Sequence, residues 1–180
     1  MNGAKAYISA QDGNRTTLTV GYSVPVASGV HGQAVSFCDG SDVTVSLFAD
    51  GSAEPKYTVS VPGGTKDSSG QYTTTYDIPE VAPGTYTMQV SKKNHVTREY
   101  TVTVSGDVKT QDAKIHLMGD INGDGRISIG DINKANLHAK GKKILLGYEL
   151  ACADINGDGR VTTSDVNKMN LHNKGKSLLW

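Results

Sequence analysis

The sequence predicts a chain of two modules, an all-β sandwich at residues 1–117 and a small α-helical module with two loop–helix repeats at residues 118–180. Apolar and polar residues alternate through the first part, which places one face of each strand in a core. The segment 119–146 recurs as 153–180. The chain also has 21 Gly but only 5 Pro, a composition that favours strands joined by glycine turns.

The expected strands of the sandwich are short, and turn signals such as Asp50-Gly51 and Pro83-Gly84 separate them. About seven or eight such strands at this spacing are typical of a β-sandwich, and tyrosines supply much of the bulk of its thin core. The alternating positions are Leu18, Val20, Tyr22 and Val24; Val43, Val45 and Leu47; Tyr57, Val59 and Val61; Tyr72, Thr74 and Tyr76; Tyr86, Met88 and Val90; Tyr100, Val102 and Val104; and Ile115 with Leu117.

Composition excludes several classes of function. Lys plus Arg and Asp plus Glu are both 18, so the net charge is zero, whereas a general nucleic-acid binder needs a basic surplus. The chain has no apolar run long enough to span a membrane. Residues 1–6 lack the apolar core of a signal peptide, which alone suggests a cytoplasmic protein. We interpret the chain instead as a fragment, with an added Met, of a longer secreted protein.

The two cysteines, Cys38 and Cys152, are too few for a disulfide framework. Two interpretations stay open, namely two small buried apolar side chains or a bridge between the two modules.

The strongest signal is the internal duplication. At an offset of 34 residues, 17 of 28 aligned positions are identical, including Asp-Ile-Asn-Gly-Asp-Gly-Arg at 120–126 and 154–160. A duplication this close predicts a module built from two like units related by a pseudo-twofold axis.

Each repeat opens with Asp-x-Asn-x-Asp-Gly and carries a further Asp eleven positions after the first, which is the 12-residue EF-hand spacing. Calcium prefers six to eight oxygen ligands, and three carboxylates per loop repel one another without a cation, so binding and folding should be coupled. The predicted ligands of two Ca²⁺ ions are Asp120, Asn122, Asp124, Ser128, Asp131 and the carbonyl of Arg126, and then Asp154, Asn156, Asp158, Thr162, Asp165 and the carbonyl of Arg160.

Two departures from calcium sensors stand out. The last ligand is Asp rather than Glu, and a strand at 114–117, not a helix, precedes the first loop. A sensor opens and closes a pair of helices around the loop, so this pattern favours a calcium-stabilised fold. A short helix is expected at 148–153, and Ile127 and Val161 are expected to join the two loops through a short β-contact.

This loop–helix duplication resembles dockerins, the calcium-binding modules that attach secreted bacterial enzymes to scaffoldins by binding cohesin domains. Residues 43–117 resemble the carboxypeptidase-regulatory-like, transthyretin-like sandwiches, on residues such as 81–90 (Val-Ala-Pro-Gly-Thr-Tyr-Thr-Met-Gln-Val). Together they look like an X-module–dockerin pair. The resemblance implies an extracellular protein that belongs to a cellulosome or amylosome. It also implies that the parent protein, rather than this chain, would contact a polysaccharide.

The resemblance also implies which residues meet the cohesin. Lys140 and Lys174, with Lys134 and Lys168, form a basic rim that is either simply solvated or steers an acidic partner. Asn136-Leu137 and Asn170-Leu171 stand where dockerins commonly have Lys-Arg, and each Leu either closes the small core or is an exposed contact. The implied contacts are Ile129, Gly130, Asn136, Leu137, Lys140 and Gly141, and then Thr163, Ser164, Asn170, Leu171, Lys174 and Gly175.

The helices after the loops should pack on each other and end near Gly141 and Gly175. In the first helix, Ile132, Ala135 and Ala139 share a face, and Val166, Met169 and Asn173 repeat this less cleanly. Trp180 is expected to pack near Met118 or Leu117, in a small core with Leu145, Leu146, Leu178 and Leu179.

Two other functions compete with cohesin binding. A carbohydrate-binding sandwich with a calcium-stabilised tail would need a planar row of exposed aromatics, and tyrosines would have to supply it because the chain has two Phe and one Trp. An enzyme is disfavoured, since the five histidines lack metal-ligand spacing and the sequence has no Gly-x-Ser-x-Gly elbow or P-loop.

Overall fold

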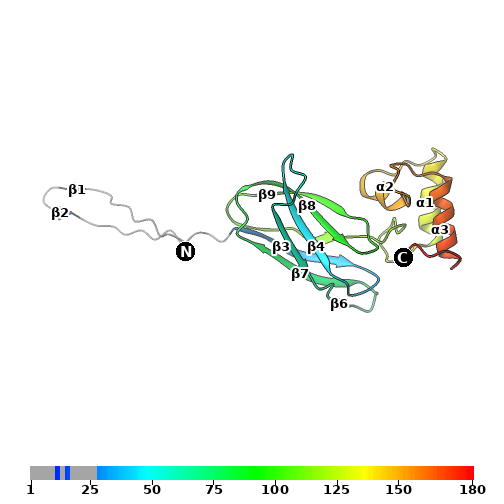
Figure 1. The fold of residues 1–180 in the computed structure, drawn as a ribbon, viewed down its shortest axis with the longest axis horizontal. Coiled ribbons are helices and arrows are strands. Elements are labelled where there is room, and N and C mark those ends of the chain that lie inside the picture. The colour runs from blue at the N-terminus through cyan, green and yellow to red at the C-terminus, as the bar shows by residue number, and fades with distance from the viewer. Residues whose placement is uncertain (1–10, 13–14, 17–27) are drawn as a thin grey trace.

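The computed structural model describes residues 11–12, 15–16 and 28–180, in which a β-sandwich is followed by a cluster of helices (Figure 1). The fold class expected from the sequence is therefore confirmed. β1 (Gln11–Asp12) pairs with β2 (Arg15–Thr16) in an antiparallel register. The strand expected around residues 18–24 lies outside the described residues.

Two sheets form the sandwich (Figure 1). One has the order β10-β3-β7-β6, with β11 also paired to β3; the other has the order β5-β4-β8-β9. All pairs are antiparallel except those of β10 and β11 with β3. The strands are β3 (Gly29–Ser36), β4 (Val43–Ala49), β5 (Tyr57–Val61), β6 (Thr65–Lys66), β7 (Tyr72–Pro79), β8 (Gly84–Lys92), β9 (Arg98–Val104), β10 (Val108–Thr110) and β11 (Ala113–Lys114).

The core of the sandwich lies between the sheets and follows the alternation in the sequence. Along β4 and β8 every second residue is buried, so one face of each strand turns inward. Tyr76 and Tyr86 are buried in this core and Tyr57 and Tyr100 pack against it, which confirms that tyrosines supply part of its bulk.

The sequence analysis missed β3, a central strand of its sheet. Its inward positions include Gly32, Ala34 and Ser36, which are small or polar and give no hydrophobic alternation. Gly32 is required because a side chain there would overlap the main-chain carbonyl of Gln111. Close backbone approach therefore explains both the strand and its weak signal.

The strand expected at 114–117 lies earlier in the chain and is shorter than predicted. β11 ends at Lys114; Ile115 still donates its N–H to the carbonyl of Val35, and Leu117 makes a single bridge with His95. The chain leaves the sheet here and runs into the first loop. Among the described residues no helix lies between β11 and that loop, as the sequence predicted.

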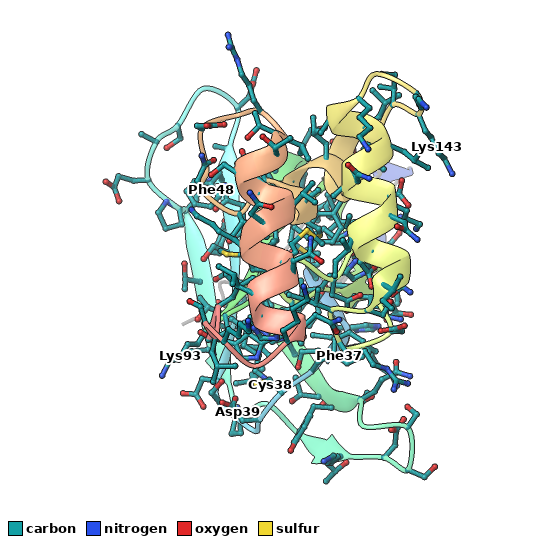
Figure 2. The ribbon with its side chains drawn as sticks, turned by 90° about the vertical axis from the view of Figure 1, so that its right-hand side faces the viewer. Phe37, Cys38, Asp39, Phe48, Lys93 and Lys143 are labelled. Carbon is teal, nitrogen blue, oxygen red and sulfur yellow. The ribbon has the colours of Figure 1, made fainter. Side chains whose placement is uncertain are left out.

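The second module contains α1 (Ile129–Ala139), α2 (Gly147–Ala153) and α3 (Thr163–Asn173). α1 and α3 lie side by side (Figure 2) and bury Ile132, Ala135, Val166 and Met169 in a second core. Asn173, by contrast, is exposed. In the part of the chain that the structure describes, no helix is long and apolar enough to cross a bilayer.

The carboxyl end agrees with expectation in part, since Met118, Leu179 and Trp180 all pack against the second core that contains Leu145. Trp180 lies on the ring of His172, with centroids 4.3 Å apart, and packs at the edge of the second core. Leu145 is buried, but Leu146 and Leu178 are exposed. The extended chain is held by N–H groups of Leu145 and Leu179 that donate to His138 and His172, so the neighbouring leucines turn outward.

Candidate calcium-binding loops

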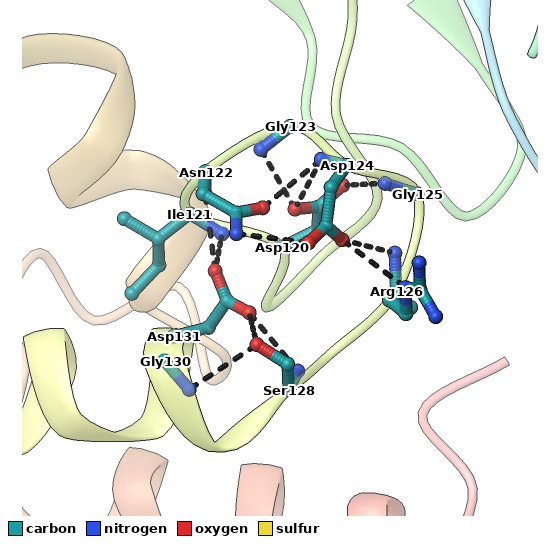
Figure 3. Close-up of polar contacts among 10 residues, drawn as sticks. All are labelled: Asp120, Ile121, Asn122, Gly123, Asp124, Gly125, Arg126, Ser128, Gly130 and Asp131. Atoms are coloured by element: carbon teal, nitrogen blue, oxygen red, sulfur yellow. Dashed lines mark hydrogen bonds and ion pairs between the residues drawn. The ribbon is translucent and has the colours of Figure 1, made fainter. Parts of the chain in front are cut away.

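The first loop, residues 120–131, is organised by the carboxylate of Asp120 (Figure 3). This carboxylate accepts hydrogen bonds from the main-chain N–H groups of Gly123, Asp124 and Gly125, at 2.7, 3.1 and 2.8 Å. Asn122 donates through Nδ2 to Asp124 at 2.9 Å. Gly123 and Gly125 have φ of 71° and 90°, the left-handed region that glycine tolerates. The loop therefore curls around its own acidic side chains.

Asp131 closes the loop and also begins α1. Its Oδ1 accepts the N–H groups of Ile121 and Asn122 at 3.0 Å, and its Oδ2 accepts the N–H and the hydroxyl of Ser128. Ser128 is the N-cap of α1, and Asp131 is the third helical residue of a capping box. The sequence analysis assigned both residues as ligands and did not identify this capping role, although Ser-x-x-Asp is a readable capping signal.

The second loop, residues 154–165, repeats these contacts. Asp154 accepts from Gly157, Asp158 and Gly159 at 2.9, 3.3 and 2.8 Å. Asp165 forms the same capping box with Thr162 at the start of α3. The duplication in the sequence is thus a duplication of hydrogen bonds.

The expected β-contact between Ile127 and Val161 is not formed: the one isolated bridge in the described part of the chain joins His95 to Leu117. Both side chains are buried in the second core instead.

Oxygen atoms make up the whole predicted ligand set of each loop: three carboxylates, an amide oxygen, a hydroxyl and a main-chain carbonyl. This set fits a hard cation such as Ca²⁺ rather than a metal that prefers nitrogen or sulfur. Within the described residues, no group of three or more His, Cys, Asp or Glu side chains is gathered closely enough to hold a metal. The carboxylates are turned to the N–H groups of their own loops, and a cation would compete with those N–H groups.

The carboxylates differ in electrostatic environment. Burial raises the pKa of Asp120 above its ordinary value, although three N–H donors oppose this effect. Burial also acts to raise the pKa of Asp165, but the N–H and hydroxyl of Thr162, together with main-chain N–H groups such as that of Asn156, outweigh it and hold that pKa below the ordinary value. Arg126 lies 3.8 Å from Asp124 at the exposed rim. A buried anion such as Asp120 is stabilised by a cation.

Two aromatic residues of the sandwich contact the first loop, and the sequence analysis did not identify them. His116 covers Gly123, and Phe37 covers Gly125, where an added Cβ would lie 2.5 Å from the Phe37 ring. No local sequence pattern predicts the contact between Phe37 and Gly125, because the two residues are far apart in the chain.

The residues implied as partner contacts all lie at the surface of α1 and α3 or at their ends. Leu137 and Leu171 are exposed, at 37% and 41%, so they do not close the core, and Ile129 is exposed at 67%. Lys134 of the basic rim lies 3.4 Å from Glu149 and is paired. The structure brings together Asn170, Leu171 and Lys174, which line one open hollow beside α3 with Asn167 and Lys176.

Neither cysteine forms a disulfide, so the bridge considered from the sequence is wrong. Cys152 is buried in the second core and burial raises its thiol pKa to about 12, whereas Cys38 is exposed. The interpretation of two buried cysteines therefore holds for Cys152 alone.

Comparisons with known proteins identify the second module. The chain is similar to two solved type II cohesin–X-dockerin complexes from Acetivibrio cellulolyticus, one with an N-terminal and one with a C-terminal interface mutant. The first is 20% identical over 81% of this chain and 94% of that chain, with a TM-score of 0.35, and the second is 21% identical over 80% and 95%, with a TM-score of 0.31. No curated protein matches the chain. The family model of the dockerin type I domain matches residues 118–172, and this chain therefore carries a dockerin type I domain after its β-sandwich.

Proposed function

We propose that residues 118–180 bind a cohesin domain of a scaffoldin in a calcium-dependent manner and so attach a secreted parent protein to a cellulosome-type assembly outside the cell. The dockerin type I match is the observation that carries this proposal. In the same proposal the division lies between residues 117 and 118, two Ca²⁺ ions occupy the two loops, and the sandwich is an X-module that spaces and stabilises the dockerin.

The α1/α3 face supports the proposed contact. Leu137 and Leu171 occupy equivalent positions of the two repeats, and both are exposed on helices that lie side by side (Figure 2). Exposed apolar residues at the centre of a polar face are a common anchor of protein interfaces. The hollow lined by Asn170, Leu171 and Lys174 supplies a recess beside that anchor.

The carbohydrate-binding alternative receives no comparable support. Tyr76 and Tyr86 are buried in the core, and Tyr57 and Tyr100 pack against it. These tyrosines stabilise the sandwich rather than form an exposed planar row.

A binding experiment tests the partner. Titration calorimetry against type I and type II cohesins, with calcium or with chelator, should give binding to at least one of them in calcium alone. Leu137→Glu combined with Leu171→Glu should weaken that binding at least about 100-fold, since two anchors of about 2 kcal/mol each are lost. Val108→Glu, at an exposed apolar residue of the sandwich, is the matched control. Undiminished affinity in the double variant would move the contact elsewhere.

A second experiment tests the ions. Calorimetric unfolding with and without chelator should show one transition that moves with calcium, from the dockerin, and one from the sandwich that changes little. Two transitions indifferent to calcium would contradict the assignment of the loops.

A further inference from the structure

The two loops have one sequence but different surroundings. Residues 120–126 and 154–160 are identical, and Gly123 and Gly157 share a φ of 71°. A Cβ on Gly123 would overlap the imidazole of His116, whereas a Cβ on Gly157 meets open space. Gly125 likewise lies against Phe37, and Gly159 has no neighbour within 4 Å of such a Cβ. The first loop is therefore covered by the sandwich, and the second faces solvent.

The two covering rings are themselves anchored. Phe37 is 2% exposed, and its N–H donates to Nε2 of His95 at 3.0 Å. The N–H of His116 donates to the hydroxyl of Tyr148 at 2.9 Å, and that hydroxyl donates to the carbonyl of Val96 at 2.6 Å. The His116 and Tyr148 rings meet edge to face at 5.0 Å. Strands and α2 thus hold the surface that touches the first loop; we call Phe37 and His116 the platform.

We propose that the platform pre-orders the first loop, so that it is the tighter and more slowly exchanging of the two calcium sites. This inference rests on the calcium binding proposed above. Ordering a loop that carries three like charges opposes ion binding, and any part of that ordering supplied by packing raises the apparent affinity. Pre-ordering the backbone of about one residue suffices for a difference of about tenfold.

Amide hydrogen exchange in chelator measures the pre-ordering without any ion. The N–H groups of residues 123–125 should exchange more slowly than those of 157–159, although both sets donate to the same kind of carboxylate. Equal exchange rates in the two loops would overturn the proposal.

Two glycine variants form a matched pair that tests the calcium affinity of each loop. Gly123→Ala and Gly157→Ala introduce the same strain at the same φ, but only the first places a methyl group against His116. In a calcium titration against a chromophoric chelator, the wild-type chain should show two constants about tenfold apart. Gly123→Ala should weaken calcium binding at the first site by more than Gly157→Ala weakens it at the second, because only the first variant also meets His116; equal losses at both sites would contradict the platform.

A variant outside the loops tests the platform without altering the sequence of either loop. Phe37→Leu keeps the buried position apolar but removes the ring that covers Gly125, so it should narrow the gap between the two constants. Phe48→Ala, at a partly exposed aromatic residue of β4 that lies away from Phe37 (Figure 2), should leave it unchanged. A chain that binds no calcium defeats the proposed function, whereas two equal sites defeat this inference alone.

Discussion

The first and second loops share one sequence, at residues 120–126 and 154–160, but lie in different environments. Both use the same three N–H donors to their first Asp and the same capping box at their last. Asp120 is nevertheless fully buried, while Asp154 is partly exposed. Local sequence therefore determines the hydrogen bonds of the loop, and the neighbouring module determines how far its charges are removed from water.

The largest effect is expected from removing the first carboxylate of each loop. In chelator, Asp120→Ala leaves N–H groups without an acceptor in a covered loop and should lower the free energy of unfolding of the dockerin by about 3 kcal/mol. Asp154→Ala should cost about 1 kcal/mol, because water replaces its carboxylate. Urea unfolding followed by the fluorescence of Trp180 measures both. Equal losses would mean that the covering of the first loop has no energetic consequence.

Lowering the pH should weaken the contact between the sandwich and the first loop, because His95 supports Phe37. Burial lowers the pKa of His95 to about 4, and its Nε2 accepts the N–H of Phe37. Since the neutral ring is favoured in the folded chain, this stabilisation is present above the ordinary pKa of about 6.5 and is lost as pH falls toward 4.

The melting temperature should therefore fall as the pH is lowered from 7 to 4. The fall should be smaller in His95→Gln than in the wild-type chain. Identical slopes in the two chains would exclude His95 as the group responsible.

The joint between the modules should show a smaller effect. Tyr148→Phe removes a hydroxyl that donates to the Val96 carbonyl and accepts the His116 N–H. We expect a loss of about 1–2 kcal/mol in urea unfolding, together with faster amide exchange in the first loop but not in the second. Tyr72→Phe is the control, since no hydrogen bond to its hydroxyl is found among the described residues. Faster exchange in both loops would argue against a local joint.

The smallest effect is expected at the end of the chain. Trp180 is partly exposed and lies on His172, which follows the second loop. Trp180→Ala should lower the stability of the dockerin by about 1 kcal/mol, the value of an aromatic pair at a surface, and Trp180→Phe by less. Melting temperatures from circular dichroism measure both. A loss of stability larger than that of Asp120→Ala would mean that the end of the chain matters more than the covered loop.

Several elements were predictable because their signals are local. The alternation around Val45 and Met88, the helix stops at Gly141 and Gly175 and the repeated loop spacing all lie within short windows of sequence. β3 was missed because Gly32, Ala34 and Ser36 carry no apolar alternation. The exposure of Leu146 and Leu178 was also missed, since the direction of a side chain in an extended tail depends on hydrogen bonds to histidines of the preceding helices.

The sequence by itself determined the two modules and the duplicated acidic loops, because residue spacing along a chain dictates strand faces, turns and caps. Tertiary structure alone decided that Phe37 and His116 cover one loop and leave its copy in water. That contact joins residues distant in sequence, and its strength depends on burial and on ring orientation, neither of which is encoded in any short segment.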